Sequence, residues 1–404
     1  MTAPTGPALI GVDEAQARLL ADVVALPVED APFSAALGRI LARDVAAMLT
    51  QPPFAASAMD GYAIRYADLP GPWRLTGTSA AGRRFTGNVG AGDAVRILTG
   101  APLPAGADTV VVQEDVARDG DALALTGDGP PRHGAHIRPA GLDFTAGTVV
   151  ARAGDRVTPA RIGVAAAGGH RSLPVHRRPR VALLATGDEL VPPGVTPGPD
   201  AIVSSNGVML AALLGPYADV IDGGIVADTA DALAAAMGAH DVDVLVTIGG
   251  ASVGDHDLVI PVLTRLGARI DFWKIALRPG KPMLSGRLGR TRIVGLPGNP
   301  VSAFVCATLF VMPLLKALGG DRAPLPTFTM LPSAVDLPAN GPRRDYLRAR
   351  FGGGTVSPFT RQDSAMLHAL ADSNVLIVRE ANASILAAGA LVPCIVLDTI
   401  SSVA

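Results

Sequence analysis

Residues 181–190 read VALLATGDEL, and residues 244–257 read VLVTIGGASVGDHD. Each stretch is an almost unbroken aliphatic run followed by a glycine-containing turn with acidic residues. Such runs predict strands that are covered by helices on both faces, because neither face is marked by polar side chains. The same alternation of strand, turn and helix continues over residues 179–320. It favours a parallel α/β sheet, whose ligands bind beyond the carboxyl ends of the strands.

Helical and strand-rich regions flank this stretch. Ala and Leu at three- and four-residue intervals predict helices over residues 15–26 and 31–41, with Asp13 as a cap. Short strand-like pieces follow, helical character returns over 159–168, and strand-like pieces resume near the end of the chain. We therefore expect a multidomain α/β protein with a β domain (46–144), an α/β domain (179–322) and a C-terminal β domain (323–404). If residues 145–178 pack on residues 1–45, the two segments form a discontinuous helical domain into which the first β domain is inserted, a condition that periodicity alone does not establish.

The composition predicts compact globular domains. Of the 404 residues, 49% are hydrophobic and 17% are charged, which is too apolar for a disordered chain. A length of this size suits two to four domains. The net charge of −2 provides no general positive surface, so we expect neither nucleic acid nor a membrane as a partner.

The two cysteines, Cys306 and Cys394, stand in separate apolar segments. They form no Cys-based metal site and suit a reducing compartment. The N-terminal segment lacks the basic and apolar regions of a signal peptide. The apolar run 301–315 is shorter than the ~18 residues of a membrane-spanning helix. We interpret that run as a buried or subunit-interface helix and expect a cytoplasmic protein.

Adjacent carboxylates, Asp188 and Glu189, follow the predicted strand 181–186. At the carboxyl edge of a sheet, two carboxylates suit a divalent cation or a proton transfer. Capping of the turn by Asp188 is the alternative, and these residues taken alone favour it.

The glycine-rich stretch 249–257 is a candidate phosphate site. Its three glycines and one serine allow backbone N–H groups to approach a phosphate, and a helix starting near Asp257 would add its positive end. Asp255 and Asp257 could bridge such a phosphate through a metal ion. A simple turn is an equal alternative.

Three cations, Lys274, Arg278 and Lys281, lie within WKIALRPGKP (273–282) and suggest an anion site. A strand over 272–277 would place Lys274 and Arg278 on one face. The alternative is a solvated edge strand whose cations discourage aggregation.

Three further motifs are SAMDGYA (57–63), RILTGAP (96–102) and GLPGNPVS (295–302). Asp60 and Thr99 lie in the first two, where a turn is the simplest interpretation. In the third, Asn299 and Pro300 form an ordinary helix start, with Pro300 at the first helical position.

Taken together and in order, SAMDGYA, RILTGAP, TGDEL, GGASVGDHD, RPGKP and GLPGNPVS resemble the motifs of the molybdopterin molybdenumtransferases, the MoeA family, a domain also found in gephyrin-like proteins. The resemblance covers nearly the whole chain. It implies an elongated homodimer whose subunits have four subdomains. The second is an inserted β domain, the third a molybdopterin-binding, MogA-like α/β unit, and the fourth a β barrel.

The resemblance also implies a reaction. Adenylated molybdopterin and molybdate are the substrates, AMP is released, and molybdenum is left on the dithiolene sulfurs. A divalent cation, usually Mg²⁺, is implied, because phosphates and molybdate are anions and carboxylates bind hard cations. The implied partners are a second subunit that shares the active site, the molybdopterin adenylyltransferase and acceptor molybdoenzymes.

Roles follow for the matching residues. Asp60 and Thr99 would reach the active site of the partner subunit from the inserted domain. The implied catalytic residues are Asp60, Thr99, Glu189, Asp228 and Asp257, of which Glu189, Asp228 and Asp257 would hold the metal ion. The implied substrate-binding residues are Gly249, Gly250, Ser252, Gly254, Lys274, Arg278, Lys281, Pro297, Pro300 and Ser364.

Some positions depart from the family pattern. Arg278 stands where many members have Lys, and a planar guanidinium binds oxyanions differently from a point charge. The segment RQDSAMLHALADSNVLIV (361–378) matches a serine-containing element only loosely, so that Ser364 and Ser373 are both candidates. Two other functions stay open. A gephyrin-like scaffold would carry a fused partner domain, and a molybdopterin adenylyltransferase would match only residues 179–320.

Overall fold

The computed structural model describes residues 9–250 and 258–397. Contacts divide the chain into two compact units. The first comprises Met1–Glu29, Gly38–Ile40 and His176–Ala404, and the second comprises Asp30–Leu37 and Leu41–Val175. The division into four domains stays a prediction.

A six-stranded sheet organises the first unit. Its order is β16 (Asp219–Val226), β13 (Arg180–Thr186), β17 (Val244–Ile248), β21 (Thr291–Leu296), β20 (Leu284–Leu288) and β18 (Arg269–Trp273). The first four strands are parallel, and β13 and β17 confirm the two strands predicted from their aliphatic runs. The predicted parallel arrangement holds for these four strands, whereas β20 is antiparallel to both of its neighbours, so the sheet as a whole is mixed. β20 and β21 are joined through Gly289 and Arg290, a two-residue connection that forces a hairpin.

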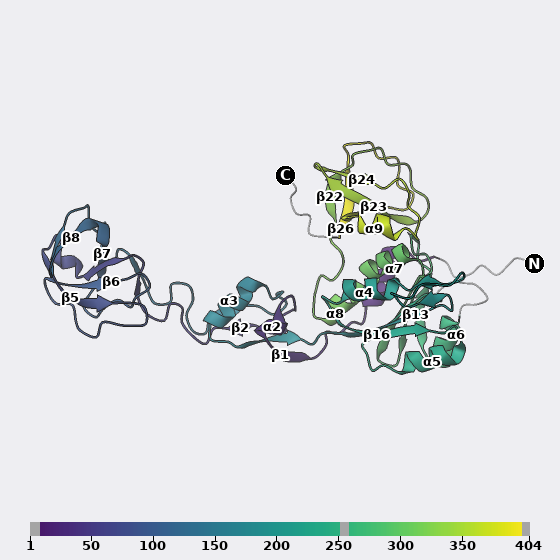
Figure 1. Cartoon of the computed structure of the whole chain (residues 1–404), viewed down its shortest axis with the longest axis horizontal. Coiled ribbons are helices and arrows are strands. Elements are labelled where there is room, and N and C mark those ends of the chain that lie inside the picture. The colour runs from purple at the N-terminus through teal and green to yellow at the C-terminus, as the bar shows by residue number, and fades with distance from the viewer. Residues whose placement is uncertain (1–8, 251–257, 398–404) are drawn as a thin grey trace, which may run out of the picture. The chain divides into compact units, whose positions relative to one another are not determined.

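Helices cover both faces of this sheet (Figure 1). One face carries α1 (Val12–Leu20), α4 (Asn206–Leu214), α7 (Pro300–Cys306), η3 (Ala307–Val311) and α8 (Met312–Leu318). The other carries α5 (Ala230–Gly238) and α6 (Val259–Arg265). Successive side chains of β13 alternate between the two cores: Val181 and Leu183 face the first group, and Ala182 and Leu184 the second. This is why the strand has no polar face.

The helical run Pro300–Leu318 is long and apolar enough to cross a membrane, but 78% of its most apolar window is buried inside the protein. The run lies in the core of the first unit, as a buried helix was predicted to do. Its π-helical turn, η3, comes just before Pro313, whose missing N–H interrupts the α-helical hydrogen-bond pattern. Thr308 donates its hydroxyl to the Phe304 carbonyl over 2.9 Å, so the buried polar atom is paired.

A second sheet in the first unit is built mainly from late residues. Its order is β19 (Leu277–Arg278), β23 (Arg344–Gly352), β25 (Val375–Arg379), β26 (Leu391–Val396) and β22 (Thr329–Pro332); β24 (Thr355–Pro358) pairs with β23, and α9 (Leu367–Ala371) precedes β25. The register places Arg278 beside Asp345.

The predicted strand over 272–277 is wrong. β18 ends at Trp273, Lys274 has a φ of +90°, and the chain then enters β19 of the other sheet. The backbone turns because Lys274 N–H donates to the Met283 carbonyl and Ile275 N–H to the Lys281 carbonyl. Lys274 and Arg278 therefore do not share a strand face.

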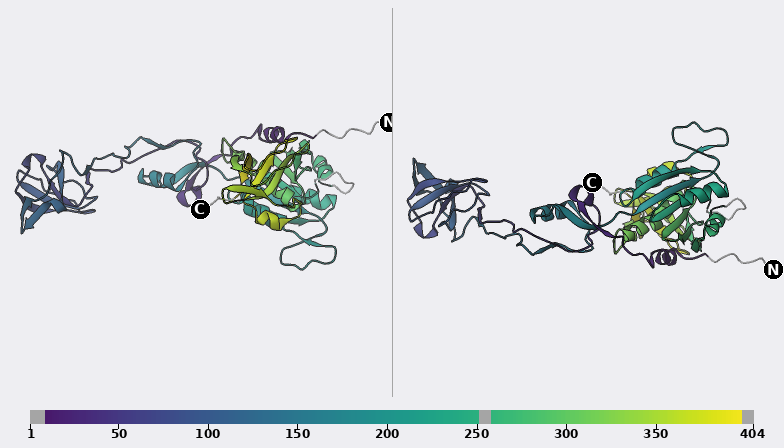
Figure 2. Two further views of the ribbon diagram at one scale, coloured as in Figure 1. Left: turned by 90° about the horizontal axis from the view of Figure 1, so that it is seen from above. Right: turned by 90° about the horizontal axis from the view of Figure 1, so that it is seen from below.

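The second unit contains another six-stranded sheet. Its order is β7 (Thr109–Val112), β4 (Gly61–Ile64), β6 (Asp93–Ile97), β5 (Trp73–Ser79), β9 (Ala122–Leu125) and β8 (Val116–Asp119). These blue strands form a compact group in every view (Figures 1 and 2). The smaller elements are β2 (Val45–Ala46), β3 (Ala56–Ser57), η1 (Tyr66–Asp68), η2 (Gln113–Asp115), β10 (Ile137–Arg138), β11 (Val149–Ala151), α3 (Pro159–Ala167) and β12 (Ser172–His176).

One of the two predicted N-terminal helices is present as α1, although Asp13 does not cap it and instead pairs with Arg344. The predicted helix over 31–41 is wrong. That segment contains the end of β1 (Val28–Pro32) and the single turn α2 (Phe33–Ala36). Pro32 disfavours a helical conformation of the preceding residue, and the left-handed Gly38 (φ +78°) prevents continuation.

Candidate functional site

The carboxyl ends of β16, β13, β17 and β21 open onto a cavity of 550 Å³, which we name the carboxyl-edge cavity. The strand register aligns Thr186 with Val226 and Ile248 with Leu296, so the loops that follow all four strands meet there. The short strands β14 (Leu190–Val191) and β15 (Ile202–Val203) and the start of α4 complete the lining. The cavity therefore lies at the edge of the sheet where parallel sheets bind ligands.

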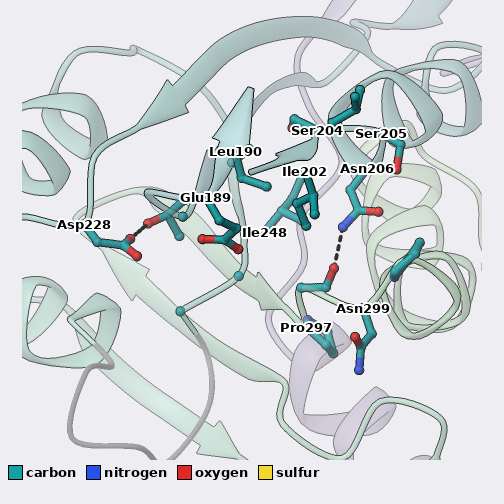
Figure 3. Close-up of a pocket in the computed structure, with 18 of the residues that line it drawn as sticks. Glu189, Leu190, Ile202, Ser204, Ser205, Asn206, Asp228, Ile248, Pro297 and Asn299 are labelled. Carbon is teal, nitrogen blue, oxygen red and sulfur yellow. Dashed lines mark hydrogen bonds between the residues drawn. The ribbon is translucent and has the colours of Figure 1, made fainter. Parts of the chain in front are cut away.

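Two exposed carboxylates, Glu189 and Asp228, line this cavity (Figure 3). The Thr186 hydroxyl donates to Asp228. The Asp228 backbone N–H donates to Asp188 Oδ1 over 3.0 Å, so Asp188 positions the loop that carries Asp228. Glu189 makes no side-chain hydrogen bond or ion pair with any described residue, and its carboxylate oxygens keep their capacity to accept.

Gly249 and Gly250 bring the next loop close to the end of β13. Both have left-handed backbones, with φ of +95° and +62°. A Cβ on Gly249 would lie 2.6 Å from the Thr186 carbonyl oxygen, and one on Gly250 would lie 2.6 Å from Val259 Cγ2. Only glycine fits both the conformation and the space. Gly249 is buried and its N–H donates to the Leu296 carbonyl over 3.0 Å, which leaves the half-buried Gly250 as the residue of this pair that faces the cavity.

Asn206 is a site residue that the sequence did not single out. Its Nδ2 donates to the Gly298 carbonyl over 2.6 Å, and its Oδ1 is buried without a hydrogen-bond partner among the described residues (Figure 3). In Figure 3, Asn206, Pro297 and Asn299 lie across the cavity from Glu189 and Asp228. The signal that could have found Asn206 is a polar triplet, SSN, at the start of an apolar helix.

Six predicted site residues line the carboxyl-edge cavity: Glu189, Asp228, Gly249, Gly250, Pro297 and Pro300. The predicted residues Ser252, Gly254 and Asp257 lie outside the described residues, so the proposed three-carboxylate metal site stays a prediction. Across residues 9–250 and 258–397, no group of three or more His, Cys, Asp or Glu is arranged to hold a metal ion.

The three predicted cations lie outside the lining of the cavity, and the described lining contains neither Lys nor Arg. The Lys274 ammonium lies 4.6 Å from the centroid of the Trp273 ring. Arg278 is ion-paired with Asp345, whose pKa is raised by burial against the opposing effect of that guanidinium. Lys281 directly precedes Pro282, which lines the cavity.

The serine-containing segment meets the start of α7. The Ser364 carbonyl accepts a hydrogen bond from the Val301 N–H over 3.0 Å, whereas the Asn299 side chain makes no capping bond. Ser373 is buried and donates its hydroxyl to the Ala369 carbonyl over 2.6 Å. Of the two candidate serines, Ser364 is therefore the one beside the cavity loop, and Ser373 has a structural contact.

Asp60 and Thr99 are brought together in the second unit. Asp60 Oδ1 accepts from the Thr99 backbone N–H over 2.7 Å and from its hydroxyl over 2.8 Å. These two bonds hold the pKa of Asp60 below its usual range, the backbone bond contributing more. Two motifs that are far apart in the sequence thus form one exposed, ionised carboxylate site.

Family models match most of the chain. Residues 10–169 match the MoeA N-terminal region (domain I and II), residues 182–317 a probable molybdopterin binding domain, and residues 331–397 the MoeA C-terminal region (domain IV).

Relatives match over most of the chain. The molybdopterin molybdenumtransferase of Haemophilus influenzae is 34% identical over 394 residues, which cover 94% of this chain and 97% of that protein. Molybdopterin molybdenumtransferase 2 of Mycobacterium tuberculosis is 36% identical over 363 residues, which cover 86% and 89%. The crystal structure of the MoeA molybdopterin biosynthesis protein of Pyrococcus horikoshii superposes with a TM-score of 0.82 at 28% identity, covering 97% of this chain and 100% of that one.

We predict that Asn206→Ala lowers the free energy of unfolding by about 1 kcal/mol, because the Gly298 carbonyl loses its donor. Asn206→Asp should cost more, since a carboxylate cannot donate and repels that carbonyl. Urea denaturation of both variants tests this, with Val208→Ala on the exposed side of α4 as the control that should change stability by less than about 0.5 kcal/mol. Wild-type stability of Asn206→Asp would contradict the prediction.

We predict that Thr99→Val raises the pKa of Asp60, because the hydroxyl bond to the charged form is lost while the backbone bond remains. The folded-state pKa is depressed, so the stabilisation from this contact is present above the unfolded pKa and is lost as the pH falls through the folded pKa. Carboxyl NMR titration measures the change, with Thr126→Val as a control. An unchanged Asp60 titration in Thr99→Val would refute this account.

Proposed function

This chain belongs to the MoeA family of molybdopterin molybdenumtransferases, and we propose that it acts through the carboxyl-edge cavity. It functions in molybdenum cofactor biosynthesis, where it inserts molybdenum from molybdate into adenylated molybdopterin with release of AMP. The observation that carries the proposal is the meeting of Glu189, Asp228 and the Gly249–Gly250 loop at the ends of adjacent parallel strands.

The charge of the cavity argues for a bound cation. Among its described lining residues, the charged ones are Glu189 and Asp228, both acidic. The substrates are anionic, so they would be repelled unless a cation lies between them and these carboxylates. We propose that Glu189 and Asp228 hold Mg²⁺, with Asp257 as the third predicted ligand, because hard carboxylate oxygens are the ligands that Mg²⁺ prefers. When bound, Mg²⁺ would neutralise charge on the adenylate phosphates and assist the departure of AMP.

The loops around the acids would bind the pterin and its phosphate. Gly250 is half-buried at the cavity and carries no side chain, whereas Gly249 is buried and its N–H donates to the Leu296 carbonyl over 3.0 Å. Pro297 and Pro300 supply rigid apolar walls. Ser252 and Gly254 extend the same predicted loop.

The nearby cations would hold oxyanions at the rim of the cavity. Lys281 is adjacent to the lining residue Pro282, and Lys274 and Ser364 complete the predicted set. Arg278 would have to exchange Asp345 for a substrate anion, and its planar fork suits both.

We further propose a homodimer in which each active site receives Asp60 and Thr99 from the partner subunit. Their hydrogen bonds keep Asp60 ionised, so this carboxylate would act as an acceptor or metal ligand and not as an acid. The molybdopterin adenylyltransferase would supply the substrate, and acceptor molybdoenzymes would receive the product. The two free, buried cysteines fit a cytoplasmic location.

We predict that the purified protein releases AMP from adenylated molybdopterin only when molybdate and Mg²⁺ are both present. Chromatographic quantification of AMP, with each component omitted in turn, measures this. Failure of a folded protein that still binds the pterin to release AMP would favour a gephyrin-like scaffold. Consumption of ATP would instead favour an adenylyltransferase.

We predict that Asp228→Asn weakens Mg²⁺ binding, so that half-maximal AMP release needs a higher Mg²⁺ concentration. The increase should be at least the roughly 10- to 100-fold that is typical when a group supporting a metal ligand is lost. The amide oxygen can still accept from Thr186, so folding should be preserved. Asp231→Asn is the matched control: it lies three residues further on, its side chain is 97% exposed, and it should leave the Mg²⁺ dependence unchanged. Equal behaviour of the two variants would exclude Asp228 as a metal ligand.

A further inference from the structure

A second cavity, of 540 Å³, lies at the opposite edge of the same sheet. We name it the amino-edge cavity because the starts of β13, β17 and β21 border it. Four arginines and two aspartates line it: Arg177, Arg180, Arg290, Arg292, Asp241 and Asp243. The function proposed for the carboxyl-edge cavity uses none of these residues.

The strand register sets these charges side by side. The Asp243 N–H donates to the Arg180 carbonyl over 3.0 Å, and the Arg292 N–H donates to the Asp243 carbonyl over 3.0 Å. Arg180, Asp243 and Arg292 are therefore neighbours across three adjacent parallel strands. Their spacing is fixed by the backbone of the sheet, which preorganises the cavity.

Both aspartates of the amino-edge cavity are already paired with arginines. Arg177 donates to both oxygens of Asp243, over 2.8 and 3.1 Å, and the Arg180 backbone N–H donates to the same carboxylate over 2.7 Å. Asp241 is ion-paired with Arg290. The hydrogen bond from Arg290 is the main cause of the lowered pKa of Asp241, so this acid stays ionised and paired.

The other two guanidinium groups have no carboxylate of their own in the cavity. Arg292 donates to the backbone carbonyls of Leu19 and Asp22, over 3.1 and 2.6 Å, and the Asp22 carboxylate accepts from Arg287. Arg292 is 9% exposed, and this burial lowers its pKa. Arg180 is exposed and makes no ion pair with a described residue. The lining thus has two positive charges in excess of its negative ones.

We propose that the amino-edge cavity binds a small molecule carrying a doubly charged tetrahedral oxyanion, either free or as a phosphate monoester. Guanidinium groups match the oxygens of such an anion in charge and in geometry. The volume exceeds the needs of one oxyanion, and Leu26, Pro27, Val242 and Leu318 provide an apolar wall for an organic group.

Calorimetric titration of the full chain, without Mg²⁺ and molybdate, tests the proposal with inorganic phosphate and AMP as separate probes. Arg180→Gln should weaken binding by roughly 10- to 100-fold, the effect of losing one charged hydrogen bond. Arg180→Lys should retain part of the affinity. Arg350→Gln is the matched control, because Arg350 is also an exposed strand arginine without a described ion pair, and it should bind as the wild type does.

The two probes distinguish the source of the oxyanion. Tighter binding of AMP than of phosphate would indicate an esterified ligand, and equal binding a free oxyanion. If AMP binding is unchanged in Arg180→Gln but lost in Asn206→Ala, AMP binds in the carboxyl-edge cavity. The proposal is overturned if neither probe binds, if neither responds to Arg180→Gln, or if Arg350→Gln has the same effect. Because Arg180 is exposed, melting of Arg180→Gln should match the wild type, and the result is then independent of folding.

Discussion

The arrangement of the first unit depends on one constraint: the backbone hydrogen bonds that hold β16, β13, β17 and β21 in parallel register. Parallel strands end at the same edge, so one register brings four loops together there and four strand starts together at the other edge. The side chains of β13 fill two separate cores, so a shift of one residue would exchange the core that each side chain fills and would lose its close packing there.

Short polar contacts then set the loops at the carboxyl edge. Thr186 and Asp188 hold Asp228, and Asn206 holds the Gly298 carbonyl. Each contact joins the loop after one strand to the loop after another or to a helix start, and so fixes these described residues relative to one another. Contacts of this kind reduce the ordering cost of binding.

How far the sequence predicts this molecule depends on the range of the interactions. Aliphatic runs predicted β13 and β17, and the acids after the first of these runs predicted Glu189, because those signals are local. Asp228 was predicted only through the family resemblance. The spacing of Ala and Leu over 31–41 predicted a helix wrongly, because Pro32 disfavours a helical conformation of the residue before it. Arg278 and Asp345 are 67 residues apart in the sequence, and their pairing depends on a sheet that no local sequence pattern predicts. Asn206 was not predicted as a site residue, because its contact is a single hydrogen bond to the carbonyl of a residue 92 positions away.

The same register separates two opposite charge environments. Among the described residues, carboxylates without Lys or Arg line one edge, and an excess of guanidinium groups lines the other. The central strand β17 has five residues, so at ~3.3 Å per residue the flanking positions 243 and 249 are roughly 20 Å apart. That distance is about two and a half times the screening length of ~8 Å in physiological salt, so an anion at the arginines changes the field at the acids very little through solvent. Any coupling between the two cavities must therefore pass through the packed strands, because a close-packed core transmits displacements that solvent does not.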